Sequence, residues 1–250
     1  MRLRTSCPVC GFRAGRTVDS FADGGSFIRI RECGTCGFLF ADRELTVEEL
    51  ANLEDDLAAR EGPATGAPAI EAGVRSHAFL VDLVRRWIGH GERVLEIGPG
   101  FGYGLAALRR ASFDAVGVES SAGRRRLAQT ISGAAVYPDM GTLPAEMVFR
   151  LAVMWHVLEH IDQPVEFLKS IGQHLATGGL VLLQVPSFEH RQSFRRTLRT
   201  TELFTQVHLS FFTRMTLAAL LRAAGFGLMQ MEMDETNFAI TATARLRSAA

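Results

Sequence analysis

Four cysteines near the amino terminus have the types and spacing of a metal site. Cys7 and Cys10 belong to one Cys-x-x-Cys-Gly turn, and Cys33 and Cys36 belong to a second. Two such turns can hold four thiolates around a tetrahedral Zn²⁺ ion, and the glycine after each pair lets backbone amides point at sulfur. The duplicated turn argues against a redox pair, and the lack of a secretory signal argues against two disulfides. The sequence therefore predicts structural zinc, with iron as the alternative ion, in a closed site that stabilises rather than catalyses.

A second chemical pattern is the stretch H-x-x-E-H formed by His156, Glu159 and His160. Inverted zinc peptidases use this pattern, with both histidines on one helix and the glutamate as general base. Here a buried strand is expected to end at Trp155, and the next helix is expected to begin only near Asp162. The three residues would then lie on a loop, so the sequence argues against a peptidase.

A third pattern is a glycine-rich turn after a predicted strand. Gly98, Gly100 and Gly102 alternate with other residues, and Glu96 lies inside the strand end. Such glycines allow a ligand to sit directly on the backbone at the carboxyl edge of a parallel sheet. Glu119 ends the next strand, where a carboxylate can accept both hydroxyls of a ribose. The dinucleotide fingerprint G-x-G-x-x-G fits poorly, because tyrosine stands where its third glycine belongs. A nucleotide-like ligand is therefore expected, with a tight turn that binds nothing as the alternative.

Strand and helix patterns alternate after residue 74, which predicts an α/β fold with a parallel sheet covered on both faces. The expected strands are 93–98, 113–119, 134–137, 149–155 and 180–185. The expected helices are 74–88, one that runs through residue 110, 121–130, 162–176 and 213–224. Two further strand patterns, 226–233 and 237–246, are close enough to pair as a hairpin.

The residues before this region predict a separate small module. A strand at 26–31 lies between the two cysteine turns, which is consistent with a zinc ribbon of about 40 residues. A capping box at 46–49 then opens a short helix, and residues 61–68 have the glycine and proline content of a linker. The predicted domains are a zinc ribbon at 1–42, a helix and linker at 43–73, and the α/β domain at 74–250.

These patterns together resemble the class I S-adenosylmethionine (SAM) dependent methyltransferases. The resemblance covers about residues 74–246 and rests on four elements in the family's order. They are Glu96-x-Gly98-x-Gly100-x-Gly102, then Glu119, then residues 155–160, and finally residues 208–212 before a helix that stops at Gly225. The family implies a Rossmann-like seven-stranded sheet in the order 3-2-1-4-5-7-6, with strand seven antiparallel. Several small-molecule members, including sugar C-methyltransferases and natural-product enzymes, also carry an amino-terminal zinc module similar to this one.

The resemblance also implies a cofactor site. Gly98, Gly100 and Gly102 would pass the methionine moiety, and Glu119 would hold the ribose. Next along the chain, Asp139 and Met140 would flank the adenine, while Trp155 and His156 would border the methionine end. One departure is Arg150, because the family often has an aspartate just inside that fourth strand.

Methyl transfer to oxygen or carbon needs in-line approach to a sulfonium, exclusion of water and usually a base for the proton. A histidine that titrates near neutrality suits this task. His160, with Glu159 beside it, is the first candidate for the base, His156 is the second and His208 is the third. Each histidine also has a structural interpretation as a loop residue bonded to backbone, and Glu159 has one as a carboxylate that orders the loop.

An arginine cluster follows the fifth predicted strand at residues 191–199. Its guanidinium groups could grip a phosphate or carboxylate on a substrate through bidentate hydrogen bonds, or they could form the solvated face of a helix. Nearby phenylalanines would line part of a pocket or, as is more usual, belong to the core. They are Phe188, Phe194, Phe204, Phe211 and Phe212.

Composition narrows the function. In 250 residues, 27 basic side chains balance 27 acidic ones, so no global charge steers the protein toward nucleic acid or an anionic membrane. No apolar stretch reaches the roughly 18 residues of a membrane span and no leader pattern is visible, so a cytoplasmic protein is expected. We expect a SAM-dependent methyltransferase of a small metabolite or natural-product intermediate, with O-methylation favoured. The alternatives are an RNA-modifying enzyme, which the mild charge of residues 1–42 disfavours, and a non-catalytic docking protein.

Overall fold

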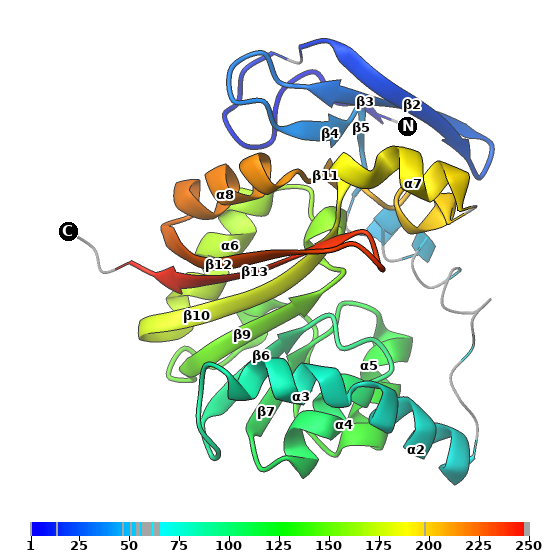
Figure 1. The fold of residues 1–250 in the computed structure, drawn as a ribbon. Helices are drawn as coiled ribbons and strands as arrows, with labels where there is room; N and C mark the ends of the chain where they lie inside the picture. Colours follow the sequence, from blue (N-terminus) through cyan, green and yellow to red (C-terminus); the bar gives the residue numbers. More distant parts are fainter. Residues whose placement is uncertain are drawn as a thin grey trace. The chain divides into compact units, whose positions relative to one another are not determined.

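Seven strands form one mixed sheet, which confirms the predicted α/β class (Figure 1). Their order in the sheet is β12-β13-β10-β9-β6-β7-β8. In chain order they are β6 (Arg93–Ile97), β7 (Asp114–Val118), β8 (Val136–Tyr137), β9 (Phe149–Trp155), β10 (Leu175–Pro186), β12 (Phe226–Asp234) and β13 (Ala239–Leu246). β6 pairs in parallel with β7 and β9, and β12 pairs antiparallel with β13, so the predicted hairpin is confirmed. The apolar side chains of β6 are almost fully buried, as expected for a strand covered on both faces.

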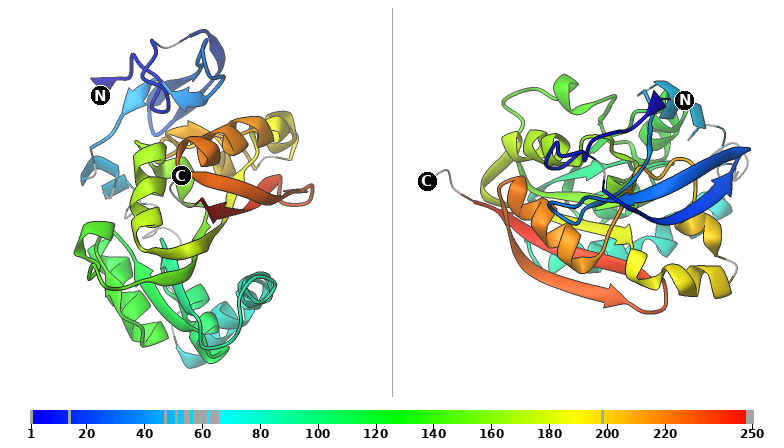
Figure 2. Two further views of the ribbon diagram at one scale, coloured as in Figure 1. Left: turned by 90° about the vertical axis from the view of Figure 1, so that its left-hand side faces the viewer. Right: turned by 90° about the horizontal axis from the view of Figure 1, so that it is seen from above.

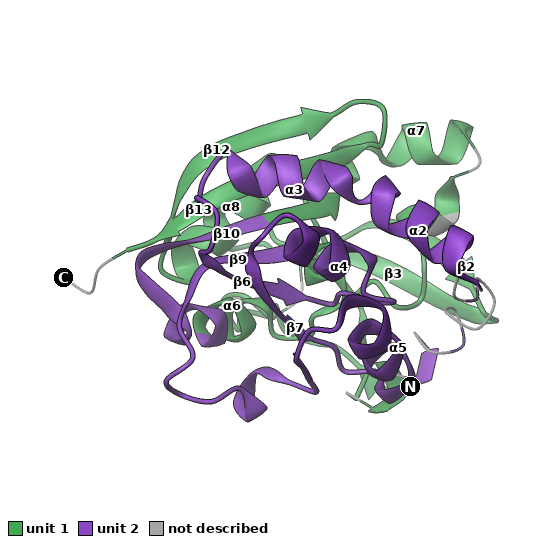
Figure 3. Cartoon of the chain, turned by 90° about the horizontal axis from the view of Figure 1, so that it is seen from below, with its two compact units in different colours: residues 1–50, 155–169, 183–247 green, residues 51–154, 170–182, 248–250 purple. Residues whose placement is uncertain are grey.

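The computed structural model describes residues 2–13, 15–46, 48–50, 52–53, 56, 62, 66–197 and 199–247. These residues form two compact units, each assembled from segments far apart in the sequence (Figure 3). Unit 1 comprises the described residues within 1–50, 155–169 and 183–247, and unit 2 those within 51–154 and 170–182. The domain boundaries derived from sequence follow the chain in order and stay a prediction.

Unit 2 contains the glycine-rich turn and the helices that support it. α4 (Tyr103–Arg110) follows the turn and packs against β7, α5 (Ala122–Ser132) and the two preceding helices (Figure 1). α5 begins as predicted, because the Ser121 side chain accepts a hydrogen bond from the Arg124 amide. It ends at Gly133, whose left-handed φ of 65° suits a glycine at a helix end.

The prediction of a single helix at 74–88 is wrong. The structure has two helices, α2 (Ala67–Ser76) and α3 (Ala78–Arg85), which are separated at His77. The Ser76 hydroxyl and His77 Nδ1 both bond to the Gly73 carbonyl, at 2.7 and 2.8 Å, and so take an acceptor that would continue the helical ladder. α2 also begins within the expected linker, with a proline in its first turn, where the missing amide hydrogen matters least.

The helix expected at 162–176 is too long. α6 covers Pro164–Gln173, and β10 begins already at Leu175. The Phe149 amide donates to the His174 carbonyl at 2.8 Å, and this bond draws the chain into strand geometry beside β9. β10 therefore begins before the strand expected at 180–185 and includes Gly178 and Gly179.

Unit 1 contains the cysteine turns and a four-stranded sheet of order β11-β4-β3-β2. β2 (Thr17–Asp23) and β3 (Ser26–Glu32) form a long hairpin, drawn in blue in Figure 2, and β3 confirms the strand expected at 26–31. β4 (Leu39–Ala41) pairs on its other side with β11 (Ser210–Phe211), which comes from the opposite end of the chain. A smaller sheet pairs β1 (Arg2–Leu3) with β5 (Arg43–Glu44).

The core of unit 1 joins this sheet to the carboxyl-terminal segment. Ile28 and Ile30 of β3 are fully buried in one cluster with Phe194 of α7 (Arg191–Arg196). Four of the five phenylalanines noted in the sequence belong to this cluster, and Phe212 is also fully buried, so their interpretation as core is confirmed. The cluster comprises Ile28, Ile30, Leu39, Ala41, Phe188, Phe194, Leu203, Phe204 and Phe211.

Two helix starts in unit 1 have a capping box, and the first of them, at 46–49, was predicted. The Thr46 hydroxyl accepts from the Glu49 amide and the Glu49 carboxylate accepts from the Thr46 amide, as a capping box requires. Thr213 and Thr216 form the corresponding pair at the start of α8 (Arg214–Ala223), which packs on β12. The expected linker at 61–68 falls largely outside the described residues. Within the described ranges, no helix combines the length and apolar character that crossing a bilayer requires.

Candidate functional site

The glycine-rich turn of unit 2 has the backbone geometry that the sequence predicted. Gly98, Gly100 and Gly102 all have positive φ, at 66°, 55° and 86°. A Cβ on Gly102 would lie 2.6 Å from the Ala128 Cα, so this glycine is required for close packing of the turn on α5. A Cβ on Gly100 would meet nothing within 4 Å, so the space in which a ligand would approach the backbone begins at Gly100.

Glu119 is fixed beside this turn by backbone amides. Its Oε2 accepts a hydrogen bond from the Gly100 amide at 3.1 Å, and its Oε1 accepts one from the Ser121 amide at 3.0 Å. Only 3% of the residue is exposed. Both bonds are charge-assisted, so they hold the carboxylate and the turn in one geometry. The structure thus brings Glu119 and Gly100 together, as expected for a ribose carboxylate next to a cofactor loop.

Glu96 is also buried, but it has a different electrostatic state. Burial alone raises the pKa of Glu96 to about 8, so its carboxyl group is protonated at neutral pH. Its Oε2 has no hydrogen-bond partner among the described residues. A Cβ on Gly104 would collide with the Glu96 carboxyl group, which explains the last glycine of the turn.

The remaining residues assigned to the cofactor lie at the ends of β8 and β9. Asp139 caps the short 3-10 helix η1 (Met140–Thr142), with its Oδ1 accepting from the Thr142 amide at 2.9 Å. Asp139 is exposed and Met140 is buried. Trp155 is the last residue of β9 and is half-buried. Their assignment to adenine and methionine stays a prediction.

His156 of unit 1 is held at both ring nitrogens. Its Nδ1 lies 3.2 Å from Glu159 Oε1, and its Nε2 lies 3.1 Å from Gln184 Oε1. The Gln184 amide nitrogen donates in turn to the Thr241 hydroxyl at 2.9 Å, which orients the amide. The His156 side chain is 45% exposed, so desolvation lowers its pKa only in part, and the hydrogen bond and charge of Glu159 raise the pKa overall. Two acceptors at the ring therefore favour the charged imidazolium.

The backbone at His156 is in the left-handed region, with φ of 55°. This conformation costs a residue with a side chain on the order of 1 kcal/mol. It also ends β9 abruptly, so residues 158–160 form a single 3-10 turn, η2 (Leu158–His160), rather than part of a longer helix. The loop expected from sequence is thereby confirmed. Gln184 and Thr241, which orient His156, carried no signal in the sequence because they come from other strands.

Glu159, His160 and His208 form a second polar group in unit 1. Glu159 is 1% exposed, and burial alone would raise its pKa. The hydrogen bond from His156 and its charge reverse this effect, so the pKa of Glu159 lies below its usual value. The rings of His160 and His208 meet edge to face with centroids 4.8 Å apart. The structure thus brings all four proposed catalytic residues into one cluster.

His208 is fixed in a single neutral form. Its Nδ1 lies 2.9 Å from the Leu203 carbonyl, which can only accept, so the proton resides on Nδ1. Burial and the neighbouring His160 lower the pKa of His208 to about 3. A residue that stays neutral throughout the physiological range is poorly suited to take up a proton.

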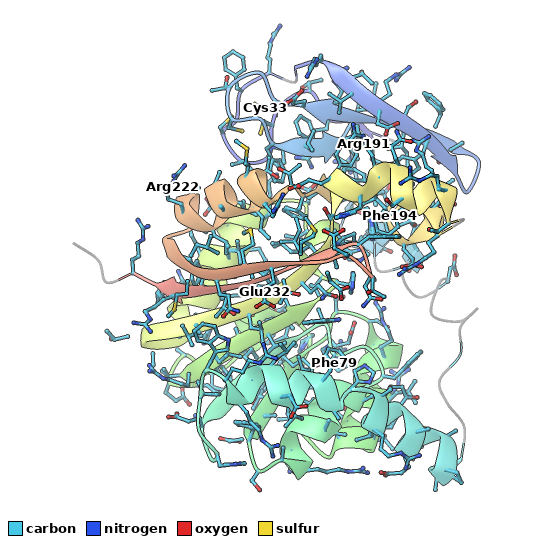
Figure 4. All side chains as sticks on the ribbon, in the orientation of Figure 1. Cys33, Phe79, Arg191, Phe194, Arg222 and Glu232 are labelled. Carbon is cyan, nitrogen blue, oxygen red and sulfur yellow. The ribbon has the colours of Figure 1, made fainter. Side chains whose placement is uncertain are left out.

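The four cysteines meet in the amino-terminal part of unit 1, where Figure 4 labels Cys33. Cys7 Sγ lies 3.6 Å from Cys36 Sγ, and Cys10 Sγ lies 3.5 Å from Cys33 Sγ. Four sulfurs at 2.3 Å from a tetrahedral Zn²⁺ are about 3.8 Å apart, so the geometry fits the ion. The two turns repeat each other, since the amides of Gly11 and Gly37 both donate to the carbonyl of the first cysteine at 2.9 Å.

The arginines of residues 191–199 contact protein groups within unit 1. Arg195 donates to Asp19 of β2 at 2.7 Å and lies over the Phe204 ring at 4.5 Å. Arg191, labelled on α7 in Figure 4, lies over the Phe188 ring at 4.9 Å. Arg199 forms a double hydrogen bond to Glu202 and lies over Phe238. The Arg195–Asp19 pair ties α7 to β2 of the amino-terminal sheet, and the other arginines contact residues of unit 1, which supports the structural interpretation of the cluster.

Comparison with known proteins identifies the family. Residues 71–230 match the family model described as a methyltransferase domain. The chain therefore belongs to this methyltransferase family. A search of curated proteins finds no match.

Solved structures share the fold at low identity. A Burkholderia thailandensis 1,6-didemethyltoxoflavin-N1-methyltransferase, bound to its substrate and S-adenosylhomocysteine, is 19% identical over 92% of this chain and 100% of that chain, with a TM-score of 0.58. A Haloferax volcanii complex of the Trm112 methyltransferase activator and a putative methyltransferase matches at 16% identity over 80% and 99%, with a TM-score of 0.63. The magnesium protoporphyrin IX methyltransferase of Synechocystis PCC 6803 matches at 16% over 80% and 97%, with a TM-score of 0.58.

Proposed function

We propose that the chain binds SAM at the glycine-rich turn and transfers its methyl group to a small molecule. The observation that carries this proposal is the buried Glu119 carboxylate, bonded to the Gly100 amide beside the space that opens at Gly100. A carboxylate in this position can accept the two hydroxyls of a ribose, and the glycines let the methionine moiety approach the backbone. Protonated Glu96 adds a neutral donor next to the same turn.

A small-molecule acceptor agrees with two of the similar structures, which are named for 1,6-didemethyltoxoflavin and magnesium protoporphyrin IX. Methylation of an oxygen is favoured, because a hydroxyl nucleophile must lose a proton and this chain has a histidine cluster that can assist its loss. An RNA acceptor gains no support from the amino-terminal sheet, since Ile28 and Ile30 are buried within unit 1. A cytoplasmic location remains a prediction.

The proton of the acceptor is removed at the cluster of His156, Glu159, His160 and His208. His208 is fixed in its neutral form and both nitrogens of His156 face acceptors, so His160 stays the first residue to test. The four cysteines contribute differently. We infer that they hold a structural Zn²⁺ ion, since four thiolates close its coordination shell.

Activity of the His160→Ala variant tests the cluster. Candidate acceptors with hydroxyl groups are screened with labelled SAM, and the best one is used to compare His160→Ala with the wild type. Loss of turnover with unchanged SAM binding is expected, because His160 acts on the acceptor. His90→Asn is the control, since His90 is an exposed histidine bonded to the Ala111 carbonyl. Unchanged turnover in His160→Ala would remove the histidine cluster from the proposal.

A further inference from the structure

Glu159, His160 and His208 have the composition and spacing of a divalent metal site. One ligand atom from each residue lies within 4.8 Å of the other two. We propose that these three side chains bind a divalent transition-metal ion, distinct from the ion at the four cysteines. The site combines two imidazole nitrogens with one carboxylate oxygen, a donor set that suits Zn²⁺, Fe²⁺ or Co²⁺.

The two carboxylate oxygens of Glu159 have different surroundings. Oε1 is engaged by His156 Nδ1, whereas Oε2 is buried and has no hydrogen-bond partner among the described residues. Leaving a buried charged oxygen without a partner is costly, and native proteins rarely do so without a functional reason. A cation bound at Oε2 would satisfy it. His156 then acts as the outer partner that orients the liganding carboxylate.

His208, like Glu159, has one polar atom held by a protein partner and the opposite atom available for a metal ion. Its Nδ1–H donates to the Leu203 carbonyl, so the lone pair is on Nε2. Metal-binding histidines usually donate their other ring nitrogen to a carbonyl or carboxylate, which fixes tautomer and ring orientation. Glu159 and His208 thus each use one atom for an outer contact and keep the opposite atom for the ion.

The backbone brings the two ligand segments together. The Leu209 amide, next to His208, donates to the Glu159 carbonyl at 2.8 Å. The His160 amide donates to the Val157 carbonyl at 3.0 Å. This bond closes the turn that carries Glu159 and His160. Ligand atoms around a tetrahedral ion are about 3.4 Å apart, so the side chains need to close by roughly 1 Å on binding. Side-chain rotation alone can supply such a shift.

This site differs from the zinc-peptidase pattern that its sequence suggests. In H-x-x-E-H peptidases the two histidines of the motif are ligands and the glutamate is the base. Here His156 is bonded to Glu159 and Gln184, and His208 takes its place as the second histidine ligand. Glu159, which corresponds to the general base of the peptidase pattern, is a ligand in the proposed site. Three protein ligands also leave a coordination position for another molecule, unlike the closed site of four cysteines.

The inference rests on the proposed function and gives its acceptor chemistry. A hydroxyl oxygen of the acceptor would take the open position, and its O–H bond would weaken because the cation stabilises the alkoxide or phenolate. The proton leaves to solvent, the oxygen forms its bond to the methyl carbon, and the carbon–sulfur bond of SAM breaks to give S-adenosylhomocysteine. The cation keeps its charge throughout. In this refinement of the proposed function His160 serves as a ligand of the ion instead of as the base, and its loss still abolishes turnover.

Metal stoichiometry tests the proposal directly. The full chain is purified with Co²⁺ supplied during expression, dialysed, and analysed for cobalt per chain by mass spectrometry. Close to two ions are expected in the wild type and in His90→Asn, and close to one in His208→Asn and His160→Asn. The ion that remains should retain the thiolate-to-cobalt absorption of the cysteine site, while the lost ion should contribute only weak visible bands. His160 is only half-buried, so His160→Asn tests the site even if His208→Asn fails to fold.

Two outcomes overturn the proposal. One is a single cobalt ion in the wild type with full thiolate absorption, and the other is an unchanged second ion in a folded His160→Asn chain. Calorimetry with SAM on the same samples separates this result from the proposed function. A chain that binds SAM but only one ion contradicts the metal site alone, whereas a folded chain that does not bind SAM contradicts the methyltransferase proposal.

Discussion

Glu96 of unit 2 and Glu159 of unit 1 are both buried glutamates near the carboxyl ends of strands, yet they carry opposite charge states. Glu96 has no cation to offset its burial, and its pKa is raised to about 8. Glu159 is equally buried, but the hydrogen bond and charge of His156 lower its pKa. The difference teaches that burial sets the cost of a charge, while the partners gathered by the fold decide whether the charge is kept.

This difference separates two chemical roles. A neutral carboxyl group at Glu96 can donate a hydrogen bond at the cofactor turn, as an ionised one cannot. An ionised carboxylate at Glu159 can orient a histidine and bind a cation. The following variants test the comparison, in order of decreasing expected effect.

Glu96→Gln should stabilise the protein strongly at high pH. The folded pKa of Glu96 lies above its unfolded value, so ionisation of the unfolded chain lowers stability as pH rises from about 4.5 to about 8. Glutamine removes this loss, and the gain above pH 8 is at most about 5 kcal/mol. Urea unfolding at pH 4 and pH 9 measures the effect. The variant and wild type should agree at pH 4, and a variant that is no more stable at pH 9 would contradict the raised pKa.

Glu159→Gln should destabilise the protein at neutral pH, which is opposite to the effect of Glu96→Gln. It removes the carboxylate that pairs with His156 and faces His160 and His208, and it should destabilise the protein by about 1–3 kcal/mol. Urea unfolding at pH 7 provides the measurement. Glu166→Gln is the matched control, because Glu166 pairs with Lys169 on an exposed helix surface and should change stability by less than about 0.5 kcal/mol. Equal effects in the two variants would show that Glu159 is not stabilised by its histidines.

Glu119→Gln extends the comparison to a third buried glutamate, which is held by amides. Glutamine keeps the size of the side chain but loses the charge that accepts from the Gly100 amide and that, in the proposed cofactor site, would accept from a ribose. Hydrogen bonds to a charged group contribute about 1.5–3 kcal/mol, so SAM affinity should fall about 10- to 100-fold. Equilibrium dialysis with labelled SAM measures the change. Unaltered affinity would place the ribose elsewhere.

Arg195→Ala should have the smallest effect, because its ion pair is partly solvated. Arg195 pairs with Asp19 and covers Phe204, and the expected loss of stability is about 1 kcal/mol. Arg196 is the matched control, since its guanidinium group donates to the Ser193 hydroxyl of its own helix. Thermal melting of Arg195→Ala and Arg196→Ala compares them. If both melt alike, α7 does not depend on Asp19 for its attachment to the amino-terminal sheet.

Local patterns allowed most of the fold and the geometry of the glycine-rich turn to be predicted. The cysteine turns, the glycine turn, the cap of α5 and the β12–β13 hairpin each depend on residues close together in the sequence. The errors have equally local causes, such as the side chains of Ser76 and His77 that interrupt a helix.

Long-range pairings were beyond sequence reasoning. β11 joins β4 across 170 residues of chain, and Gln184 and Thr241 reach His156 from two other strands. The H-x-x-E-H stretch shows the consequence most clearly. Its residues were identified as candidates from the sequence. That His208 lies beside Glu159 and His160 depends on a contact made by the fold, which no sequence periodicity or spacing predicts.

A crystal structure of the full chain with S-adenosylhomocysteine tests the central claim most directly. The account predicts both ribose hydroxyls on the Glu119 carboxylate and the homocysteine moiety along the backbone at Gly98 and Gly100. Electron density for the ligand away from this turn, or a ribose that makes no contact with Glu119, would contradict it.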